Sequence, residues 1–577
     1  MAKNNSANKI SRRKFLEIST LAAAGVLTGF PPVRAAAPTA DLVLINGKII
    51  TVDAQDSIVE GVAVRGGRII DTGAAAKISK YIGTETKVIA LQGKTVTPGL
   101  IDSHAHLPPF GQRENGWFVK LHGIESKEEI LEMLTQKARH LSKGEWISAW
   151  GIEDISLSYF AKEDLDKVTK EHPLLVVHTS GQWGFANSLA LKIAKIDGNT
   201  ASPPGSKVVM KFFTKEPTGA LVHYPALELV RKYMPMPTNE QAKEALLFAA
   251  NLYAAEGVTA VHDNFFMLGT QYNHRAYFEL VQSGKLPVRM KIWPYFPNLS
   301  VASRVFKSLF TSEKQLPPGP PVLIHYKKSA PELFSSLWGG FKIAIDGVAL
   351  WYGSPRGVPL HRTEDLHAMV KLFHQAGHQI SIHAAGDMAV DIILNALEAS
   401  FKEYPRQNHR HRIEHAIAPP SGSLERIKRL GIVISTHPQF IYSWGDKWRM
   451  KNAAGAIPLN SYRKEGIPVA LGADPPAFPL YQPQIALWQA LKRTTKAGSP
   501  FDSAESISIQ DALRMQTMGS AYAGFQEKEI GSIETGKLAD MAVWDRDYYS
   551  IPKDEIKNVK AVLTFMGGKI VYERQPL

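Results

Sequence analysis

The spacing of apolar positions differs between the two ends of the chain and its middle. Short apolar runs separated by turn residues occupy residues 41–96 and return at residues 540–572. Such runs predict β-strands, and an Asn-Gly or Gly-Gly pair between two of them predicts a two-residue hairpin. The pairs are Asn46-Gly47, Gly66-Gly67 and Gly567-Gly568. We therefore predict one small β-sandwich domain, built from residues 38–97 and 525–577.

In the middle of the chain, apolar runs alternate with helical patterns such as Thr238–Glu256 and Glu364–Ala376, which is typical of β/α units. Eight runs have the length of buried strands. They are Gly99–Ser103, Gly257–His262, Pro287–Trp293, Phe341–Asp346, Gln379–His383, His411–His415, Ile432–Ser435 and Pro468–Gly472. Eight units predict an α/β fold, a closed (β/α)8 TIM barrel over residues 98–524. Residues 107–237 exceed one crossover, and we predict that they form an inserted subdomain over the barrel mouth.

Two histidines follow the first predicted strand of the barrel. His104 and His106 are two residues apart in an extended segment, so their side chains point to the same side. Two imidazoles at the end of a strand can bind one divalent ion. Taken alone, this pair is a weak signal, because two polar residues leaving a strand are common.

Other polar residues fall on the ends of later strands. His383 ends the fifth strand, His415 ends the sixth, and Asp474 follows the eighth. Lys342 lies in an apolar run on the fourth strand, where an unpaired ammonium is costly to bury. Each alone has a structural alternative, such as a helix N-cap for Asp474. Because active sites of such barrels lie at the carboxyl ends of the strands, we predict that these residues share one site.

The N-terminal residues predict export. Ser11-Arg-Arg-Lys-Phe-Leu16 resembles the twin-arginine signal, a weakly apolar segment follows at Ile18–Phe30, and Ala35-Ala-Ala37 offers a cleavage pattern. We predict a signal peptide at residues 1–37, recognition by the twin-arginine translocase, and a periplasmic or otherwise exported protein. The apolar segment is too short and polar to span a bilayer comfortably, so no stable membrane anchor is expected. A disordered basic N-terminus or an uncleaved anchor is the alternative.

Composition narrows the chemistry. The 577 residues carry a formal charge of +13, and residues 1–37 contain six basic side chains and one acidic one, which leaves about +8 for the rest. These charges are dispersed, without a basic run, so nucleic acid is not an expected partner. The chain has no cysteine. Metal binding would therefore depend on histidine, carboxylate and lysine.

Several of these segments together resemble the amidohydrolase superfamily, and within it the YtcJ-like family that includes N-substituted formamide deformylases. The segments are Pro98–His106, Phe341–Gly347, His383–Asp387, Arg412–His415, Leu471–Pro475 and Gly531–Asp540. The resemblance covers nearly everything after the leader. Two positions depart from the family pattern. Gln182 occupies a position where the family usually has a histidine, and His223 lies near a position where an acidic residue is common.

The resemblance implies a metal centre. By it, His104, His106, His383 and His415 would bind one or two divalent ions, most often zinc. Lys342 would be carboxylated and would bridge the ions, and Asp474 would be both a ligand and the general acid/base. A divalent ion lowers the pKa of bound water and polarises a carbonyl oxygen, which agrees with this set.

Residues near the predicted barrel mouth suggest substrate contacts. The aromatic candidates are Trp183, Trp351 and Trp444, and the polar candidates are His437 and Gln439. Loops at this face form the pocket, so we expect a small-molecule amide with aromatic or bulky apolar character. The alternative is that several of these aromatic side chains pack the inserted subdomain onto the barrel.

We therefore predict an exported, metal-dependent enzyme that hydrolyses a linear or N-substituted amide, a non-peptide carbon–nitrogen bond. One alternative is a lactonase, deaminase or isomerase on the same scaffold, because fold does not fix function. The other is a periplasmic binding protein without catalysis. The sequence leaves the substrate, the metal and its count, and a homo-oligomeric state open.

Overall fold

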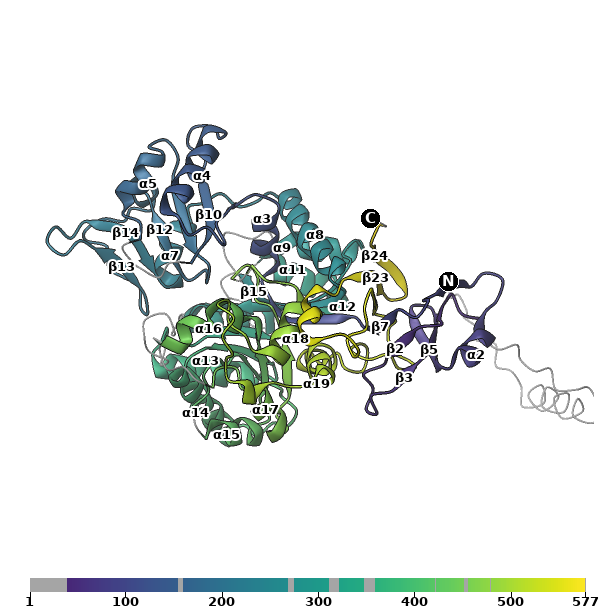
Figure 1. The fold of residues 1–577 in the computed structure, drawn as a ribbon. Coiled ribbons are helices and arrows are strands. Elements are labelled where there is room, and N and C mark those ends of the chain that lie inside the picture. The colour runs from purple at the N-terminus through teal and green to yellow at the C-terminus, as the bar shows by residue number, and fades with distance from the viewer. Residues whose placement is uncertain are drawn as a thin grey trace, which may run out of the picture.

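The structure is a computed structural model that describes residues 39–153, 159–267, 274–310, 321–346, 359–420, 422–450, 455–477 and 479–575 (Figure 1). The predicted signal peptide at residues 1–37 and the predicted substrate contact Trp351 lie outside these ranges. In the part of the chain that is described, no helix has the length and apolar character needed to cross a membrane.

Eight parallel strands form the central sheet, in an order that follows the sequence from one edge to the other. They are β8 (Leu100–Ala105), β15 (Val258–Met267), β16 (Arg289–Tyr295), β17 (Phe341–Ala344), β18 (Ile380–Ala384), β19 (Arg412–His415), β20 (Val433–Thr436) and β21 (Val469–Leu471). Each overlaps a predicted run. The last strand returns to the first: the Asp474 amide donates to the His104 carbonyl at 2.7 Å, and the Ala473 amide donates to Asp102 at 3.1 Å. The predicted TIM barrel is confirmed.

Helices pack on the outer face of the barrel because strand side chains alternate between the two faces. On β17, Phe341 stacks on Phe373 with ring centroids 4.0 Å apart, and its neighbour Lys342 points to the interior. The helices are α3 (Leu107–Glu114), α8 (Asn239–Ala255), α9 (His274–Gln282), α10 (Leu299–Phe310), α11 (Pro321–Ser329), α12 (Pro331–Leu337), α13 (Thr363–Gln375), α14 (Asp387–Glu403), α15 (Ser423–Arg429), α16 (Gln439–Met450), α17 (Leu459–Glu465), α18 (Pro483–Lys492), α19 (Ile509–Arg514) and α20 (Ser520–Ala523).

The predicted helix at Thr238–Glu256 shows how local sequence sets a boundary. The Thr238 hydroxyl accepts a hydrogen bond from the Gln241 amide at 3.2 Å, and the Gln241 side chain accepts one from the Thr238 amide at 2.9 Å. This reciprocal pair is a capping box, which satisfies two amides that the first turn leaves free. Helix α8 therefore begins at Asn239, and its buried face packs on the barrel through residues such as Leu246 and Tyr253.

A separate subdomain interrupts the barrel between β8 and β15 and projects from one side of it (Figure 1). Its six-stranded sheet has the order β13-β14-β12-β11-β10-β9. The strands are β9 (Val119–Lys120), β10 (Ile147–Ile152), β11 (Leu174–His178), β12 (Trp183–Ala186), β13 (Lys207–Met210) and β14 (Pro217–Val222), with helices α4 (Lys127–Arg139), α5 (Lys162–Val168), α6 (Ser188–Ile193) and α7 (Tyr224–Arg231). Two apolar clusters of its own stabilise it.

The two chain ends meet in a pair of sheets beside the barrel (Figure 1). Strand β22 of the C-terminal segment pairs antiparallel with β7 of the N-terminal segment, which joins the ends in one six-stranded sheet. Residues of both ends, such as Val96 and Phe565, share one apolar cluster. The elements are β1 (Leu42–Ile45), β2 (Lys48–Ile50), β3 (Ile58–Val59), β4 (Gly61–Arg65), β5 (Arg68–Gly73), α2 (Ala75–Ile78), β6 (Lys87–Ala90), β7 (Thr95–Pro98), β22 (Met541–Trp544), β23 (Ala561–Met566) and β24 (Lys569–Glu573).

Two of the three predicted hairpins are confirmed, and one is wrong. Gly66-Gly67 joins the paired strands β4 and β5, and Gly567-Gly568 joins β23 and β24. Asn46-Gly47 instead connects β1 of the four-stranded sheet to β2 of the six-stranded sheet. A Cβ on Gly47 would lie 2.3 Å from Leu91 Cδ1, so the absence of a side chain permits close packing here. The tight turn itself was predictable. The two strands that flank it do not pair with each other, because β1 pairs with β4 and β6 and β2 pairs with β3 and β7.

Candidate metal centre

Six side chains singled out by the sequence meet at the carboxyl ends of the barrel strands. They come from β8 and the residue after it, from β17, β18 and β19, and from the segment after β21. All six line one cavity of about 100 Å³: His104, His106, Lys342, His383, His415 and Asp474. Residues spread over 371 positions thus share one site, because parallel strands bring their carboxyl ends to one face of a barrel.

The nitrogen and oxygen atoms at this site have the spacing of a ligand set. The ring centroids of His383 and His415 are 4.4 Å apart, and those of His104 and His415 are 4.8 Å apart. Asp474 Oδ1 lies 2.8 Å from His106 Nε2 and 3.6 Å from His104 Nε2. Ligand atoms of His104, His106 and Asp474 all lie within 4.8 Å of one another. A single ion between these atoms could contact all three.

The protonation of the histidines also fits a metal ion. Burial lowers the pKa of His383 to about 3, and the nearby Lys342 ammonium acts in the same direction. Burial likewise holds the pKa values of His104 and His415 well below the ordinary value for histidine. Neutral imidazoles keep the lone pair that a metal ion needs. Histidine nitrogens with a carboxylate oxygen are ligands typical of zinc, so the residues present fit a divalent ion.

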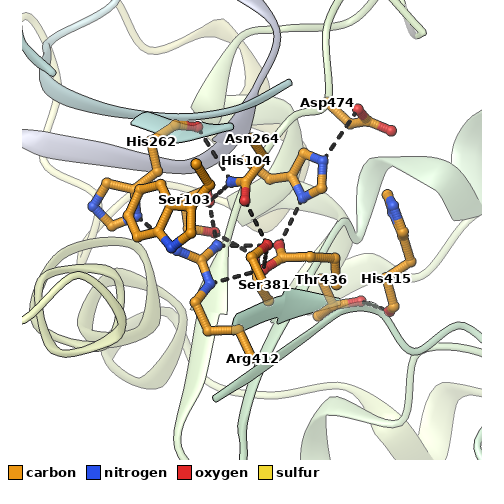
Figure 2. Close-up of polar contacts among 12 residues, drawn as sticks. Ser103, His104, His262, Asn264, Ser381, Arg412, His415, Thr436 and Asp474 are labelled. Atoms are coloured by element: carbon orange, nitrogen blue, oxygen red, sulfur yellow. Dashed lines mark hydrogen bonds and ion pairs between the residues drawn. The ribbon is translucent and has the colours of Figure 1, made fainter. Parts of the chain in front are cut away.

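His104 is oriented by a carboxylate below it in the barrel. Its Nδ1 atom lies 2.6 Å from Glu414 Oε2, so the opposite ring atom, Nε2, faces Asp474 and the cavity (Figure 2). A carboxylate on the outer nitrogen of a ligating histidine fixes the tautomer and the ring orientation. Glu414 is in the position to do this for His104.

Glu414 is itself held by the polar interior of the barrel. Arg412 Nε lies 2.8 Å from Glu414 Oε1, and the Ser381 hydroxyl donates to the same oxygen at 2.8 Å. Burial raises the pKa of Glu414, but Arg412 and Lys342 outweigh it, so this pKa lies below its ordinary value. The Ser381 hydroxyl oxygen also lies 2.6 Å from Asn264 Oδ1, so its one proton is shared between the two acceptors (Figure 2). The carboxylate is therefore ionised and fixed before any ligand binds.

Lys342 is the most unusual side chain at the site. Its Nζ atom is buried and has no hydrogen-bond partner among the described residues. Burial lowers the pKa of Lys342 to about 8, although the carboxylates of Glu414 and Asp474 act in the opposite direction. A buried ammonium without a hydrogen-bond acceptor is costly, so this position favours a chemical form of lysine other than the plain cation.

The backbone turns sharply where Asp474 and His415 enter the site. Asp474 has φ of 56° and His415 has φ of 74°, both in the left-handed region. Aspartate tolerates this region better than most residues, whereas histidine there is less common. The turns direct both side chains back over the end of the barrel, so the local strain serves the placement of the site.

The two polar residues predicted to contact substrate, His437 and Gln439, lie directly after β20, as their place in the sequence implied. The His437 ring lies 5.1 Å from that of His104 and 4.8 Å from that of His415, measured between centroids. A ligand atom of His437 lies within 4.8 Å of one on each of these histidines, which makes it a further candidate ligand. Gln439 is buried and donates to the Gly472 carbonyl at 2.8 Å, so it holds the end of β21. Neither lines the cavity wall described above.

Two predicted aromatic contacts pack in apolar cores. Trp183 is buried in the inserted subdomain, where its ring stacks on His178 at 4.5 Å. Trp444 on α16 packs against Phe440 and Trp448 in the core of the barrel. Neither lines the cavity. We assign both a packing role, which was the alternative interpretation of these aromatic residues.

The inserted subdomain supplies one wall of the cavity. Tyr224 at the start of α7 packs against Tyr295 at the end of β16, with ring centroids 5.8 Å apart. These two residues form an apolar cluster with Ala344 and Leu360 that joins the subdomain to the barrel. Other lining residues of the subdomain are Trp150, Ser180, Gly181, Gln182 and Arg231. The wall thus combines the aromatic rings of Trp150 and Tyr224 with polar groups such as Gln182 and Arg231.

Sequence reasoning missed Glu414, Arg412 and, apart from Gln182, the residues of this wall as parts of the site. The sequence contained a signal for the first two. Positions 412 and 414 share one face of a strand, and a charge buried in a strand is stable only when an opposite charge pairs with it. Asp346 also had a signal, since it follows β17. It lies 3.5 Å from His383 and accepts hydrogen bonds from the amides of Ala385 and Gly386. No local pattern marks the wall residues, because they meet the site only through tertiary packing.

A closed barrel with clustered histidines and an acid at its strand ends defines a class of hydrolytic enzymes. The sequence model described as the amidohydrolase family matches residues 87–572, and the chain belongs to this family. It is a hydrolase that acts on carbon–nitrogen bonds.

Individual relatives cover nearly the whole chain. The N-substituted formamide deformylase of Arthrobacter pascens is 28% identical over 92% of this chain and 98% of its own. The protein YtcJ of Bacillus subtilis is 29% identical over 92% of this chain and 99% of its own. A solved structure described as an uncharacterized metal-dependent hydrolase of Pyrococcus horikoshii has a TM-score of 0.68 at 23% identity. It covers 89% of this chain and 99% of its own, which supports the fold.

Proposed function

We propose that the protein is an exported, metal-dependent amidohydrolase that cleaves a linear or N-substituted amide. The observation that carries this proposal is the meeting of four histidines, Lys342 and Asp474 in one cavity. The name of the Arthrobacter pascens relative, an N-substituted formamide deformylase, supports the class of bond.

The metal ligands are His104, His106, His383 and His415, with Asp474 as a carboxylate ligand, and we propose zinc at one or two positions. His437 is a further candidate, because it lies beside His104 and His415. A divalent ion bound here would lower the pKa of a water molecule toward neutrality and would polarise the substrate carbonyl. The protein holds the ligand nitrogens in place through Glu414 and the network below it.

Lys342 is proposed to be carboxylated. Its neutral amine attacks carbon dioxide, forms a nitrogen–carbon bond and releases one proton, which leaves a carbamate anion on the side chain. The pKa of about 8 at Lys342 makes the reactive neutral amine accessible near neutral pH. The product replaces a buried cation with an anionic oxygen ligand, which removes the cost of the unpartnered ammonium.

Asp474 is proposed to be the general acid/base. Its carboxylate accepts a proton from the attacking water and returns it to the leaving nitrogen, so that the amine departs neutral. Its position against His106 and His104 places the carboxylate at the centre of the site. The aromatic wall formed by Trp150, Tyr224 and Tyr295 favours an aromatic or bulky apolar group on the amide.

Export through the twin-arginine translocase remains part of this proposal, based on Ser11–Leu16 and the segment that follows it. This route carries folded proteins, so the metal could be bound before export.

The direct experiment combines metal analysis with a substrate screen. Purified mature protein is analysed for its metal content, stripped with a chelator, and assayed on a panel of N-formyl and N-acyl amines before and after zinc is returned. We expect amine release that falls with the metal and recovers with it. Full activity on amides in metal-free protein would contradict metal dependence, and a metal-loaded protein that cleaves only lactones would contradict the amide assignment.

A further inference from the structure

Arg231 is buried in the wall of the cavity, at the last residue of α7. Only 6% of its surface is exposed, so the side chain is packed in the protein and does not extend into bulk solvent. The same residue and Trp150 also line a second, larger cavity of about 810 Å³ in the inserted subdomain. Arg231 and Trp150 thus form the boundary between the outer cavity and the metal centre.

The guanidinium group has few partners in the protein. Among the described residues, its one hydrogen bond goes to the Gly181 carbonyl at a long 3.5 Å, and no carboxylate of these residues lies within 4.0 Å. Glu228 acts on it only at longer range and accepts a hydrogen bond from Tyr224 instead. The remaining contacts are the faces of Trp150 and Tyr224, each 5.6 Å from the guanidinium carbon. A guanidinium has five N–H donors, so most of them are available here.

Other buried arginines of this protein are different. Among the described residues, four besides Arg231 are buried, and each meets carboxylates or several carbonyls. These partners are Glu114 for Arg113, Glu527 for Arg410, Glu414 for Arg412, and the carbonyls of Ala456, Ile457, Phe501 and Asp502 for Arg493. The fold therefore satisfies buried guanidinium groups elsewhere, and Arg231 is the exception.

We propose that Arg231 determines specificity by binding a carboxylate of the substrate at the end remote from the cleaved amide. A guanidinium and a carboxylate form two parallel hydrogen bonds in one plane. The rings of Trp150 and Tyr224 contact the Arg231 guanidinium and hold it in position. The substrate class is then an amide with an apolar or aromatic middle and an acidic end. This inference rests on the proposed function for the cleaved bond, but the anion site stands on its own contacts.

The charges around the cavity agree with an anionic ligand. Among the described side chains that line it, Arg231 supplies a cation, and Asp474 and the proposed carbamate of Lys342 supply anions at the end where the metal ligands lie. Bound metal ions would add positive charge at one end of the cavity. An acidic substrate would therefore be attracted toward the site, and a cationic one would be repelled.

The test measures binding without catalysis. Phenylacetate and its uncharged analogue phenethyl alcohol, neither of which contains an amide, are titrated by calorimetry into the purified, metal-loaded protein. In Arg231→Met we expect the affinity for phenylacetate to fall by about ten- to a hundredfold while the affinity for phenethyl alcohol stays the same. Arg139→Met on α4 removes an exposed arginine and is the matched charge control.

Thermal unfolding establishes that the variants are folded, and Arg231→Gln, which keeps a polar side chain of similar length, replaces Arg231→Met if that variant is not. Unchanged phenylacetate binding in a folded Arg231 variant would overturn the proposal, as would equal losses for the two probes. This result is separable from the proposed function. If the protein cleaves amides but binds phenylacetate equally well without Arg231, only the anion site is contradicted. If phenylacetate binding depends on Arg231 but no amide is cleaved, only the proposed reaction is contradicted.

Discussion

His104 Nδ1 lies 2.6 Å from Glu414 Oε2, and both side chains are buried. The two residues are 310 positions apart and belong to β8 and β19. The contact leaves only Nε2 of His104 directed at the cavity, so a residue outside the cavity wall determines which atom of the histidine can bind a metal ion.

The first prediction concerns this contact. Glu414→Gln removes the negative charge from the outer nitrogen of His104 and should weaken zinc binding by about ten- to a hundredfold. Competition with a chromophoric chelator measures the affinity. Ser381→Ala is the control, because it removes a hydrogen bond to Glu414 and leaves the carboxylate on His104. Equal zinc affinity in Glu414→Gln and the wild type would show that Glu414 serves only the packing of the barrel.

The second prediction concerns Lys342. Lys342→Ala removes the proposed carbamate, so metal content and activity should both fall, and short carboxylic acids such as acetate should partly restore them by filling the space. Metal analysis with and without acetate measures this. Lys291→Ala, which removes a partly buried lysine on the neighbouring strand β16, should change neither. Full metal occupancy and normal turnover in Lys342→Ala would exclude a role as ligand.

The third prediction concerns Asp474. Asp474→Asn keeps the shape of the side chain but cannot accept the proton, so kcat should fall by about a hundred- to ten-thousandfold while KM changes little. Steady-state kinetics on the best amide from the screen gives both constants. Asp391→Asn on α14 neutralises an exposed carboxylate and should leave both near the wild-type values. An Asp474→Asn enzyme with wild-type kcat would restrict this residue to a structural role.

The fourth prediction separates two tryptophans. Trp150 lines the cavity, so Trp150→Ala should raise the activation free energy that determines kcat/KM by about 1–3 kcal/mol for bulky aromatic amides. It should leave kcat/KM for small amides unchanged. Trp444 packs in the core, so Trp444→Ala should lower the free energy of unfolding by about 3–5 kcal/mol and not change the ratio between substrates. Denaturant unfolding and a substrate pair measure the two effects. The assignment fails if Trp444→Ala changes the selectivity and Trp150→Ala does not.

The fifth prediction concerns export. A twin-arginine signal depends on its arginine pair, so Arg12→Lys combined with Arg13→Lys should retain the protein in the cytoplasm. Immunoblots of periplasmic and cytoplasmic fractions measure this. Arg34→Lys, outside the pair, is the control and should be exported. Equal periplasmic recovery of the double variant would indicate another route.

Much of the architecture was predictable because local periodicity reflects burial. All eight barrel strands overlap predicted runs, and the ends of the chain form the small β domain by pairing β22 with β7. The hairpin predicted at Asn46-Gly47 was wrong because a turn sequence specifies the local backbone and not the distant strands that pair beyond it. Trp183 and Trp444 illustrate the same limit: an aromatic residue near a barrel end suits a core and a pocket equally well by sequence.

The sequence by itself determined the family, the barrel and the polar residues at its strand ends, because strand ends and metal-binding side chains have local signatures. Only the tertiary structure decided which atoms face the cavity. It directed Nε2 of His104 inward through Glu414, placed His437 beside the other histidines, bound Gln439 to the Gly472 carbonyl, and left Arg231 buried with one weak hydrogen bond among the described residues. These outcomes depend on contacts between residues far apart in the chain, whose distances and orientations no local pattern of residues encodes.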